Sequence, residues 1–181
     1  MKIFGIVAAV VLAIVLMVVG GAISARNWAV TTEARIEALH QERVSKLANY
    51  EIKVVTAAQV PEMYRDDLTK VVRASIEGRY GQDGAKAVFL AISESQINYD
   101  ATIYKKIQDM IEIGRNDYMQ SQTELTDVVG QYKAGLQTFP RVIFVSMMGY
   151  PKLNLSDYNA VQTDRVEQTF KTGKEEVIKL R

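Results

Sequence analysis

The chain has 181 residues, of which 48% are hydrophobic, and its 22 basic and 21 acidic side chains leave a formal net charge of +1. This length fits one domain with an appendage. The near-neutral charge argues against nucleic acid as a partner, because phosphate binding requires clustered Lys and Arg in excess. The absence of cysteine excludes disulfides, thiolate metal sites and cysteine nucleophiles.

The first segment, MKIFGIVAAVVLAIVLMVVGGAISAR, carries one charge at Lys2 and none again until Arg26. A membrane-spanning helix needs about 20 mostly apolar residues. We therefore predict that residues 1–25 are a transmembrane anchor, which contacts the lipid bilayer through residues 3–25. The anchoring side chains are predicted to be Ile3, Phe4, Val10, Leu12, Leu16, Val19 and, in the headgroup layer, Trp28.

A cleaved signal peptide is the alternative, because small residues would permit cleavage before Ala25. The apolar run is longer than the roughly 7–15 residues of a signal-peptide core, which favours an uncleaved anchor. Lys and Arg nearly balance on the two sides of this segment. The positive-inside rule therefore leaves the side of the remaining chain open.

Beyond Arg26 the sequence predicts an amphipathic stalk that continues the membrane helix as far as a kink at Pro61. Its apolar positions are predicted to be Val30, Ala34, Ile36, Leu39, Val44 and Leu47.

Three more helical stripes follow Pro61, with the turn GRYGQDG (residues 78–84) after the first of them. RNDYMQSQTE is either a turn or part of a continuing helix. The stripes comprise Tyr64, Leu68, Val71, Val72, Ser75 and Ile76, then Ala85, Val88, Phe89, Ile92, Ser95, Tyr99, Ile103, Ile107, Met110, Ile111 and Gly114, then Leu125, Val128, Val129, Tyr132, Leu136 and Phe139.

Helices of this kind cannot each bury an apolar face alone, so the sequence predicts an all-α fold. In this fold the N-terminal transmembrane helix continues into a long antiparallel helical bundle over residues 26–160. Residues 161–181 are predicted to be a polar, charged tail, either a frayed helix or disordered.

No residue pattern indicates catalysis, a cofactor, a metal or a small-molecule substrate, so we expect a protein that is not an enzyme. His40 stands alone among charged residues, and the pairs Asp66-Asp67 and Glu175-Glu176 are interpreted as solvated charge. Asn154 begins a glycosylation sequon, a pattern that arises often by chance. Gly114 is predicted to mark a close helix crossing. Three tyrosines are predicted to be core residues, namely Tyr99, Tyr118 and Tyr132.

The stretch LQTFPRVIFVSMMGY (residues 136–150) is too short to cross a bilayer. Because proline ends or begins helices, we predict a corner followed by a short apolar helix or extended plug. This segment either caps the bundle or forms an exposed contact surface, through Phe139, Pro140, Ile143, Met147, Met148, Gly149 and Tyr150.

Two segments resemble the LemA family of bacterial membrane-associated helical proteins: VPEMYRDDLTKVV around Pro61 and QYKAGLQTFPRVIFVSMMGYPKLNLSDY (residues 131–158). The chain departs from that family before Pro61, where EIKVVTAAQVP replaces a longer arginine-rich stretch. The resemblance implies an antiparallel helical bundle tethered to the bacterial cytoplasmic (inner) membrane by a single pass. It implies no catalytic activity.

The resulting functional prediction is a non-enzymatic, membrane-anchored scaffold or interaction protein. We expect it to bind protein partners or to self-associate into a homo-oligomer, since a stalk with mixed apolar and charged faces can pair laterally as in a coiled coil. The alternative is a regulatory or sensor subunit of an envelope process such as membrane proteolysis.

Overall fold

The computed structural model describes residues 2–79, 83–94 and 101–158. Over these residues the chain forms helices and no strand: α1 (Lys2–Ala58), α2 (Glu62–Ile76), α3 (Gly84–Glu94), α4 (Ala101–Gln137), α5 (Arg141–Met147) and the 3-10 helix η2 (Leu155–Tyr158). The predicted all-α class is therefore confirmed, with an N-terminal helix long and apolar enough to cross a membrane.

Several predictions concern residues outside the described ranges. These are the tail 161–181 with Glu175 and Glu176, the stripe positions Ser95 and Tyr99, and the middle of the 78–84 turn.

The described residues form two compact units, and α1 and α4 contribute to both. The first unit comprises residues 2–41 and 124–158, and the second comprises residues 42–79, 83–94 and 101–123. In each unit α1 pairs with α4 in opposite sequence order. In the first unit Trp28 contacts Tyr132, and the later residue Arg35 pairs with the earlier residue Glu124. In the second unit Arg43 bonds Gln122, and the later residue Tyr50 bonds the earlier residue Asp117. The predicted antiparallel arrangement holds within each unit.

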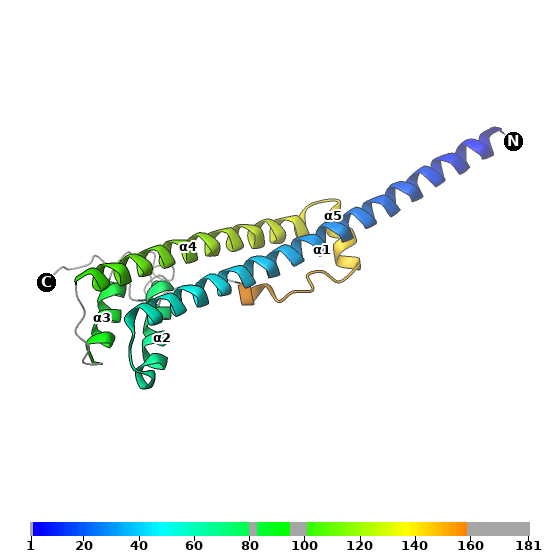
Figure 1. Cartoon of the computed structure of the whole chain (residues 1–181). Coiled ribbons are helices and arrows are strands. Elements are labelled where there is room, and N and C mark those ends of the chain that lie inside the picture. Colours follow the sequence, from blue (N-terminus) through cyan, green and yellow to red (C-terminus); the bar gives the residue numbers. More distant parts are fainter. Residues whose placement is uncertain (1, 80–82, 95–100, 159–181) are drawn as a thin grey trace, which may run out of the picture. The chain divides into compact units, whose positions relative to one another are not determined.

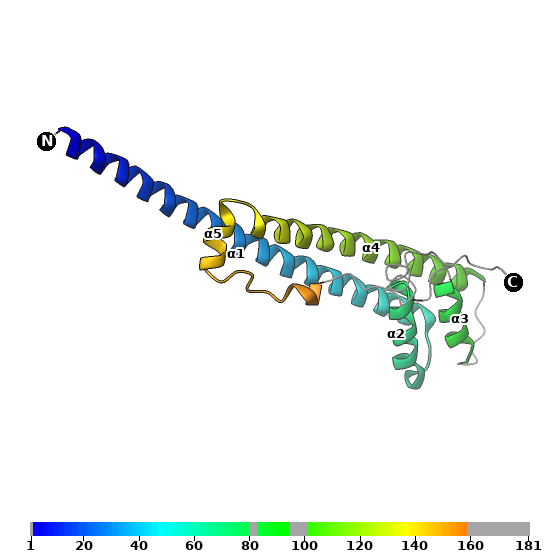
Figure 2. The same cartoon turned by 180° about the vertical axis from the view of Figure 1, so that it is seen from behind.

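The first unit packs α5 and the following segment, residues 149–158, against α1 and α4 (Figures 1 and 2). We call residues 149–158 the C-terminal strap. The buried core of this unit consists of Ala25, Ala29, Ile36, Leu125, Val128, Val129, Tyr132 and Val145. The rings of His40 on α1 and Tyr158 meet nearly at right angles with a centroid distance of 5.2 Å, which places the end of the strap on α1.

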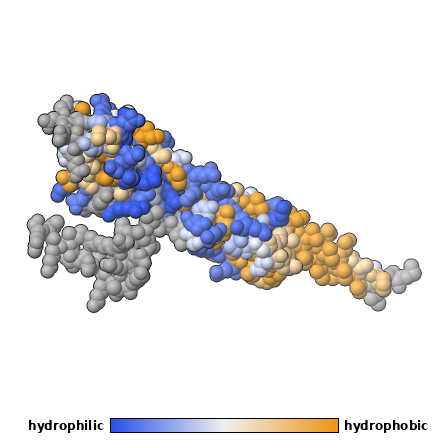
Figure 3. Space-filling model, turned by 90° about the horizontal axis from the view of Figure 1, so that it is seen from below, coloured by the Kyte–Doolittle hydropathy of each residue, from blue (hydrophilic) through white to orange (hydrophobic). Residues whose placement is uncertain are grey.

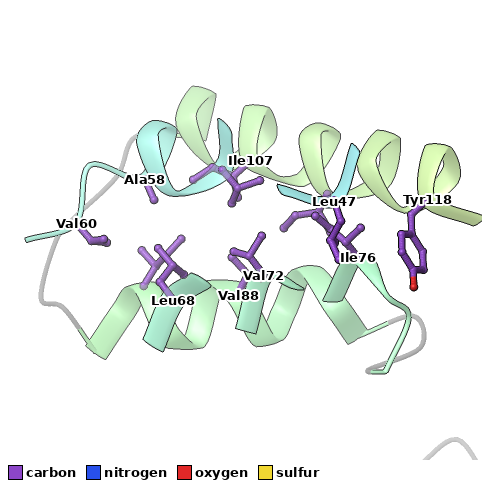
Figure 4. Packing of buried hydrophobic residues seen from close by; sticks show 12 residues of the cluster. Leu47, Ala58, Val60, Leu68, Val72, Ile76, Val88, Ile107 and Tyr118 are labelled. Atoms are coloured by element: carbon purple, nitrogen blue, oxygen red, sulfur yellow. The ribbon is translucent and has the colours of Figure 1, made fainter. Parts of the chain in front are cut away.

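In the second unit, the antiparallel hairpin of α2 and α3 covers the paired segments of α1 and α4 (Figure 4). Figure 4 shows Leu68, Val72 and Val88 of the hairpin directed toward Ala58 and Ile107. The α2–α3 hairpin closes tightly, because Ser75 Oγ donates to the carbonyl of Gly84 at 2.9 Å. The stripe of α2 is confirmed, with Leu68, Val72, Ser75 and Ile76 buried.

Two predictions about α1 are wrong. Pro61 does not kink a continuing helix: α1 ends at Ala58, Gln59 adopts a φ of +46°, and Pro61 caps the start of α2. A proline suits this position because it has no N–H to leave unpaired. The stalk stripe is wrong in part: Ile36 and Leu47 are buried as predicted, and Leu39 packs beside the first core. Val30, Ala34 and Val44 are exposed, however, while Ala29, Glu33 and Arg43 are buried.

The second predicted stripe, a single pattern in the sequence, is divided between two helices. Its residues from Ala85 to Ile92 lie on α3, and those from Ile103 to Gly114 lie on α4 together with the third stripe as far as Leu136. RNDYMQSQTE lies inside α4, which runs without interruption from Ala101 to Gln137, so the continuing helix is the correct alternative. Its polar residues are only partly solvated, because Ser121 and Gln122 are buried. The predicted close crossing at Gly114 is confirmed. A Cβ atom on Gly114 would lie 2.8 Å from Cγ of Tyr50 on α1.

Candidate functional site

The first part of α1 exposes its apolar side chains all around the helix. Every described side chain from Phe4 to Gly20 is exposed, whereas burial begins with Gly21 and Ala22. The predicted anchor residues Phe4, Val10, Leu12, Leu16 and Val19 are therefore exposed, and the side chain of Ile3 lies outside the described residues. Figure 3 shows this segment as a continuous hydrophobic surface. A helix that is apolar on all sides is typical of burial in a membrane or a large core.

Directly after this apolar segment, α1 places a buried carboxyl group at Glu33, whose exposed fraction is 8%. Its Oε1 atom accepts hydrogen bonds from the Tyr132 hydroxyl at 2.7 Å, from the Lys152 backbone N–H at 2.6 Å and from the Leu153 N–H at 3.4 Å. Buried polar groups are costly unless they are hydrogen-bonded. Glu33 thus fixes α4 and the C-terminal strap to one point of α1.

Tyr132 forms the other half of this buried contact. Its side chain is fully buried. Burial raises the pKa of the Tyr132 phenol, and the hydrogen bond to Glu33 raises it further. The neutral phenol is therefore the form that the folded protein favours, and it remains a hydrogen-bond donor to Glu33.

Trp28 lies on the same side of α1 and is half-buried. Its ring contacts the Tyr132 ring at a centroid distance of 5.3 Å, and the Arg141 guanidinium stacks over it at 3.9 Å. A Cβ on Gly135 would collide with the Trp28 ring, so glycine is needed for this approach of α4. Trp28, predicted as a headgroup-layer anchor, thus connects α1 with α4 and with the first residue of α5.

The predicted cap or contact segment forms α5, which has two different faces. Val145 is buried, and Phe144 and Met148 pack beside it in the first core. On the other side Phe139, Ile143 and Met147 are exposed by 75%, 50% and 82%. The segment therefore covers the core with one face and presents an apolar surface with the other.

The ends of α5 are set by proline and glycine. Pro140 is the N-cap and follows a cis peptide bond with Phe139. At the other end Gly149 has a φ of +69°, and Tyr150 N–H donates to the carbonyl of Val145 at 3.0 Å. This is a Schellman ending, which requires the left-handed conformation that glycine adopts readily. The half-buried Tyr150 then begins the strap that leads to Glu33.

The second unit uses its buried polar side chains as contacts between helices. Arg73 of α2 forms a bidentate pair with the buried Glu51 of α1, through Nε at 2.6 Å and Nη2 at 3.0 Å. The Tyr50 hydroxyl donates to Asp117 Oδ2 at 2.5 Å, and this bond raises the pKa of Tyr50. These bonds fix the register of α1 against α2 and α4.

Several polar side chains of the described residues make local contacts within one helix or turn. Ser93 and Ser121 donate to helix carbonyls one turn earlier, Leu90 at 2.7 Å and Asp117 at 2.9 Å. Asp67 pairs with Lys70 on the exposed face of α2. The exposed Asn154 bonds Asp157 through its amide at 3.0 Å. Within the described residues no group of three or more acidic or histidine side chains is placed to hold a metal ion.

The sequence analysis did not identify Glu33 and Arg141 as residues that connect different elements of the first unit. A signal for Glu33 was available, because it lies four residues after Ala29 on the buried stripe of α1. A charged residue at such a position requires a partner from another element. The partners of Glu33 come from residues about 100 positions later, which local periodicity does not reveal.

No family model, curated protein or solved structure matches this chain.

Proposed function

We propose that this chain is a single-pass protein of a bacterial inner membrane, in which residues 3–25 cross the bilayer and the helical units act as a scaffold of the LemA type. The scaffold binds protein partners, including second copies of itself, and performs no catalysis.

The observation that carries the proposal is the continuity of α1 from Lys2 to Ala58. Its first part is apolar and exposed on all sides, while its later turns belong to the two buried cores. Because the helix is uninterrupted, the anchor continues directly into the residues of α1 that pack in the first unit. At about 1.5 Å per residue the apolar segment from Ile3 to Ala25 is about 34 Å long, enough for a hydrocarbon core of about 30 Å.

The use of buried polar groups supports a scaffold. The described buried acids, Glu33 and Glu51, are both bonded to donors from other elements. Such bonds specify helix register and orientation. The resemblance of residues 131–158 to LemA proteins supports a membrane-tethered bundle by analogy.

Exposed apolar side chains in the second unit offer contact points for partners. Met63 on α2 and Leu90 on α3 are exposed by 77% and 60%. A photo-crosslinking amino acid at either position in living cells should yield discrete adducts with a partner or with a second copy. The matched control is Lys70 on the charged face of α2, where adducts should be absent or nonspecific.

Two further measurements make the test decisive. Differently tagged copies should co-purify from detergent if self-association occurs. A strictly monomeric protein without specific adducts from Met63 or Leu90 would contradict the scaffold. Mass spectrometry of the N-terminus tests the anchor separately, since a mature chain beginning at Ala25 would have lost it.

A further inference from the structure

The outer face of α5 is apolar although nothing in the first unit covers it. Ile143 and Met147 are four residues apart and share one side of the helix, and Phe139 precedes the helix at its first end. The opposite face packs on α1 through Phe144 and Val145. The outer face therefore makes no contribution to the core of this unit.

A contact with the last turns of the apolar segment fixes the position of α5. A Cβ on Gly21 would lie 3.0 Å from Cε2 and 3.1 Å from Cζ of Phe144, so the Phe144 ring lies against Gly21. Gly21 precedes Ala25, the end of the proposed span, by only about 6 Å along a helix axis. The α5 helix thus lies beside the end of the membrane segment.

The charged residues nearest to Gly21 and to α5 in the sequence are basic, whereas the acidic Glu33, which is buried, and Asp157 follow further along the chain. Residues 1–32 and residues 134–156 contain no Asp or Glu. The same ranges contain Lys2, Arg26, Arg141 and Lys152. Arg26 and Lys152 are exposed, and Arg141 stacks on Trp28. An apolar face with a basic border is typical of segments that lie in the headgroup layer of an anionic membrane.

We infer that α5 is a second membrane contact: Phe139, Ile143 and Met147 insert at the boundary between headgroups and acyl chains, and Arg26, Arg141 and Lys152 bind anionic headgroups. The occupant of this apolar face is lipid, not a protein partner. The inference rests on the proposed membrane anchor, because the position of α5 is defined relative to the span.

Site-directed spin labelling can test this inference in the full-length chain. Because the chain has no cysteine, single cysteines can be introduced and labelled without a background. Labels at Phe139 and Met147 are compared in vesicles of phosphatidylcholine with phosphatidylglycerol, using accessibility to oxygen and to a neutral nickel chelate. We expect high oxygen and low nickel accessibility at both positions, as for residues at the edge of the hydrocarbon.

Two labels in the same unit serve as references. Leu12, in the middle of the apolar segment, should be the deepest position if the anchor spans the bilayer. Asp127, on the exposed side of α4, should show high nickel accessibility. If Leu12 is deep while Phe139 and Met147 behave like Asp127, the inference about α5 is wrong and the anchor stands. If Leu12 is itself exposed to nickel, the proposed anchor fails.

A protein occupant would give a different result. Labels at Phe139 and Met147 would then be immobilised and inaccessible to both oxygen and nickel, which would overturn the assignment of lipid to this face.

The basic residues beside α5 are tested in vesicles of phosphatidylcholine alone, where nickel accessibility at Met147 should rise. Equal accessibility in both vesicle types would contradict the role of the basic residues. Far-UV circular dichroism of each labelled protein checks that the helices remain.

Discussion

Tyr132 of α4 donates its hydroxyl hydrogen to Oε1 of Glu33 on α1 over 2.7 Å, and both side chains are buried. The same oxygen accepts the backbone N–H of Lys152. One carboxyl group thereby connects three parts of the first unit that lie far apart in the sequence. This contact places the C-terminal strap and, through it, the end of α5.

Replacing Glu33 tests whether this contact holds the first unit together. We expect Glu33→Ala to lower the free energy of unfolding by about 2 kcal/mol, because a buried hydroxyl and a backbone N–H lose their acceptor. Glu33→Gln keeps an acceptor oxygen and should cost less than half as much. Urea unfolding in detergent micelles, followed by circular dichroism, measures both variants. Equal losses would show that hydrogen-bond acceptance by Glu33 contributes little.

The raised pKa of Tyr132 predicts a pH dependence of stability. The folded state holds the phenol proton more tightly than the unfolded state, so this contribution is complete below the ordinary tyrosine pKa of about 10 and is lost as pH rises above it. Tyr132→Phe removes this group while Tyr50 and Tyr118, whose pKa values are also raised, remain. Urea midpoints measured from about pH 8 to 11.5 should fall more steeply for the wild type than for Tyr132→Phe. Parallel curves would contradict the prediction.

Two glycines of α4 form a matched pair for testing the close helix crossing. Gly114→Ala should destabilise the second unit, since its Cβ would lie 2.8 Å from Cγ and 3.0 Å from Cδ1 of Tyr50. Gly130→Ala meets no atom within 4 Å and should stabilise α4 by about 0.5–1 kcal/mol, because alanine is the better helix former. Thermal unfolding of both variants gives the comparison. Stabilisation by both substitutions would show that α1 and α4 do not need glycine at residue 114.

The two faces of α5 predict opposite outcomes for two truncations. Val145→Ala removes buried methyl groups and should lower the free energy of unfolding by about 2 kcal/mol. Phe139→Ala changes an exposed side chain and should alter it by less than about 0.5 kcal/mol in detergent. Chemical unfolding in detergent separates the two effects. A large loss for Phe139→Ala would show that Phe139 belongs to the core rather than to the outer surface.

The amino-acid sequence by itself determined the helical class, the length of the apolar segment and the two ends of α5. Local causes suffice for these features: a 3.6-residue periodicity, a run of apolar residues, Pro140 at a helix start and Gly149 at a helix end. The burial of Tyr118 and Tyr132 was also predicted, because both lie close to apolar stripes or within one.

The tertiary structure alone decided which side of α1 is buried and what its polar residues contact. Val30, predicted on the apolar stripe, is exposed, whereas the charged Glu33 is buried, because burial depends on the neighbouring helix and not only on the hydrophobicity of the residue. Likewise the sequence of α5 is apolar on both faces, and only its contact through Phe144 with Gly21 distinguishes the packed face from the exposed one. Periodicity describes one helix, whereas these features arise between residues of different helices that lie far apart in the sequence.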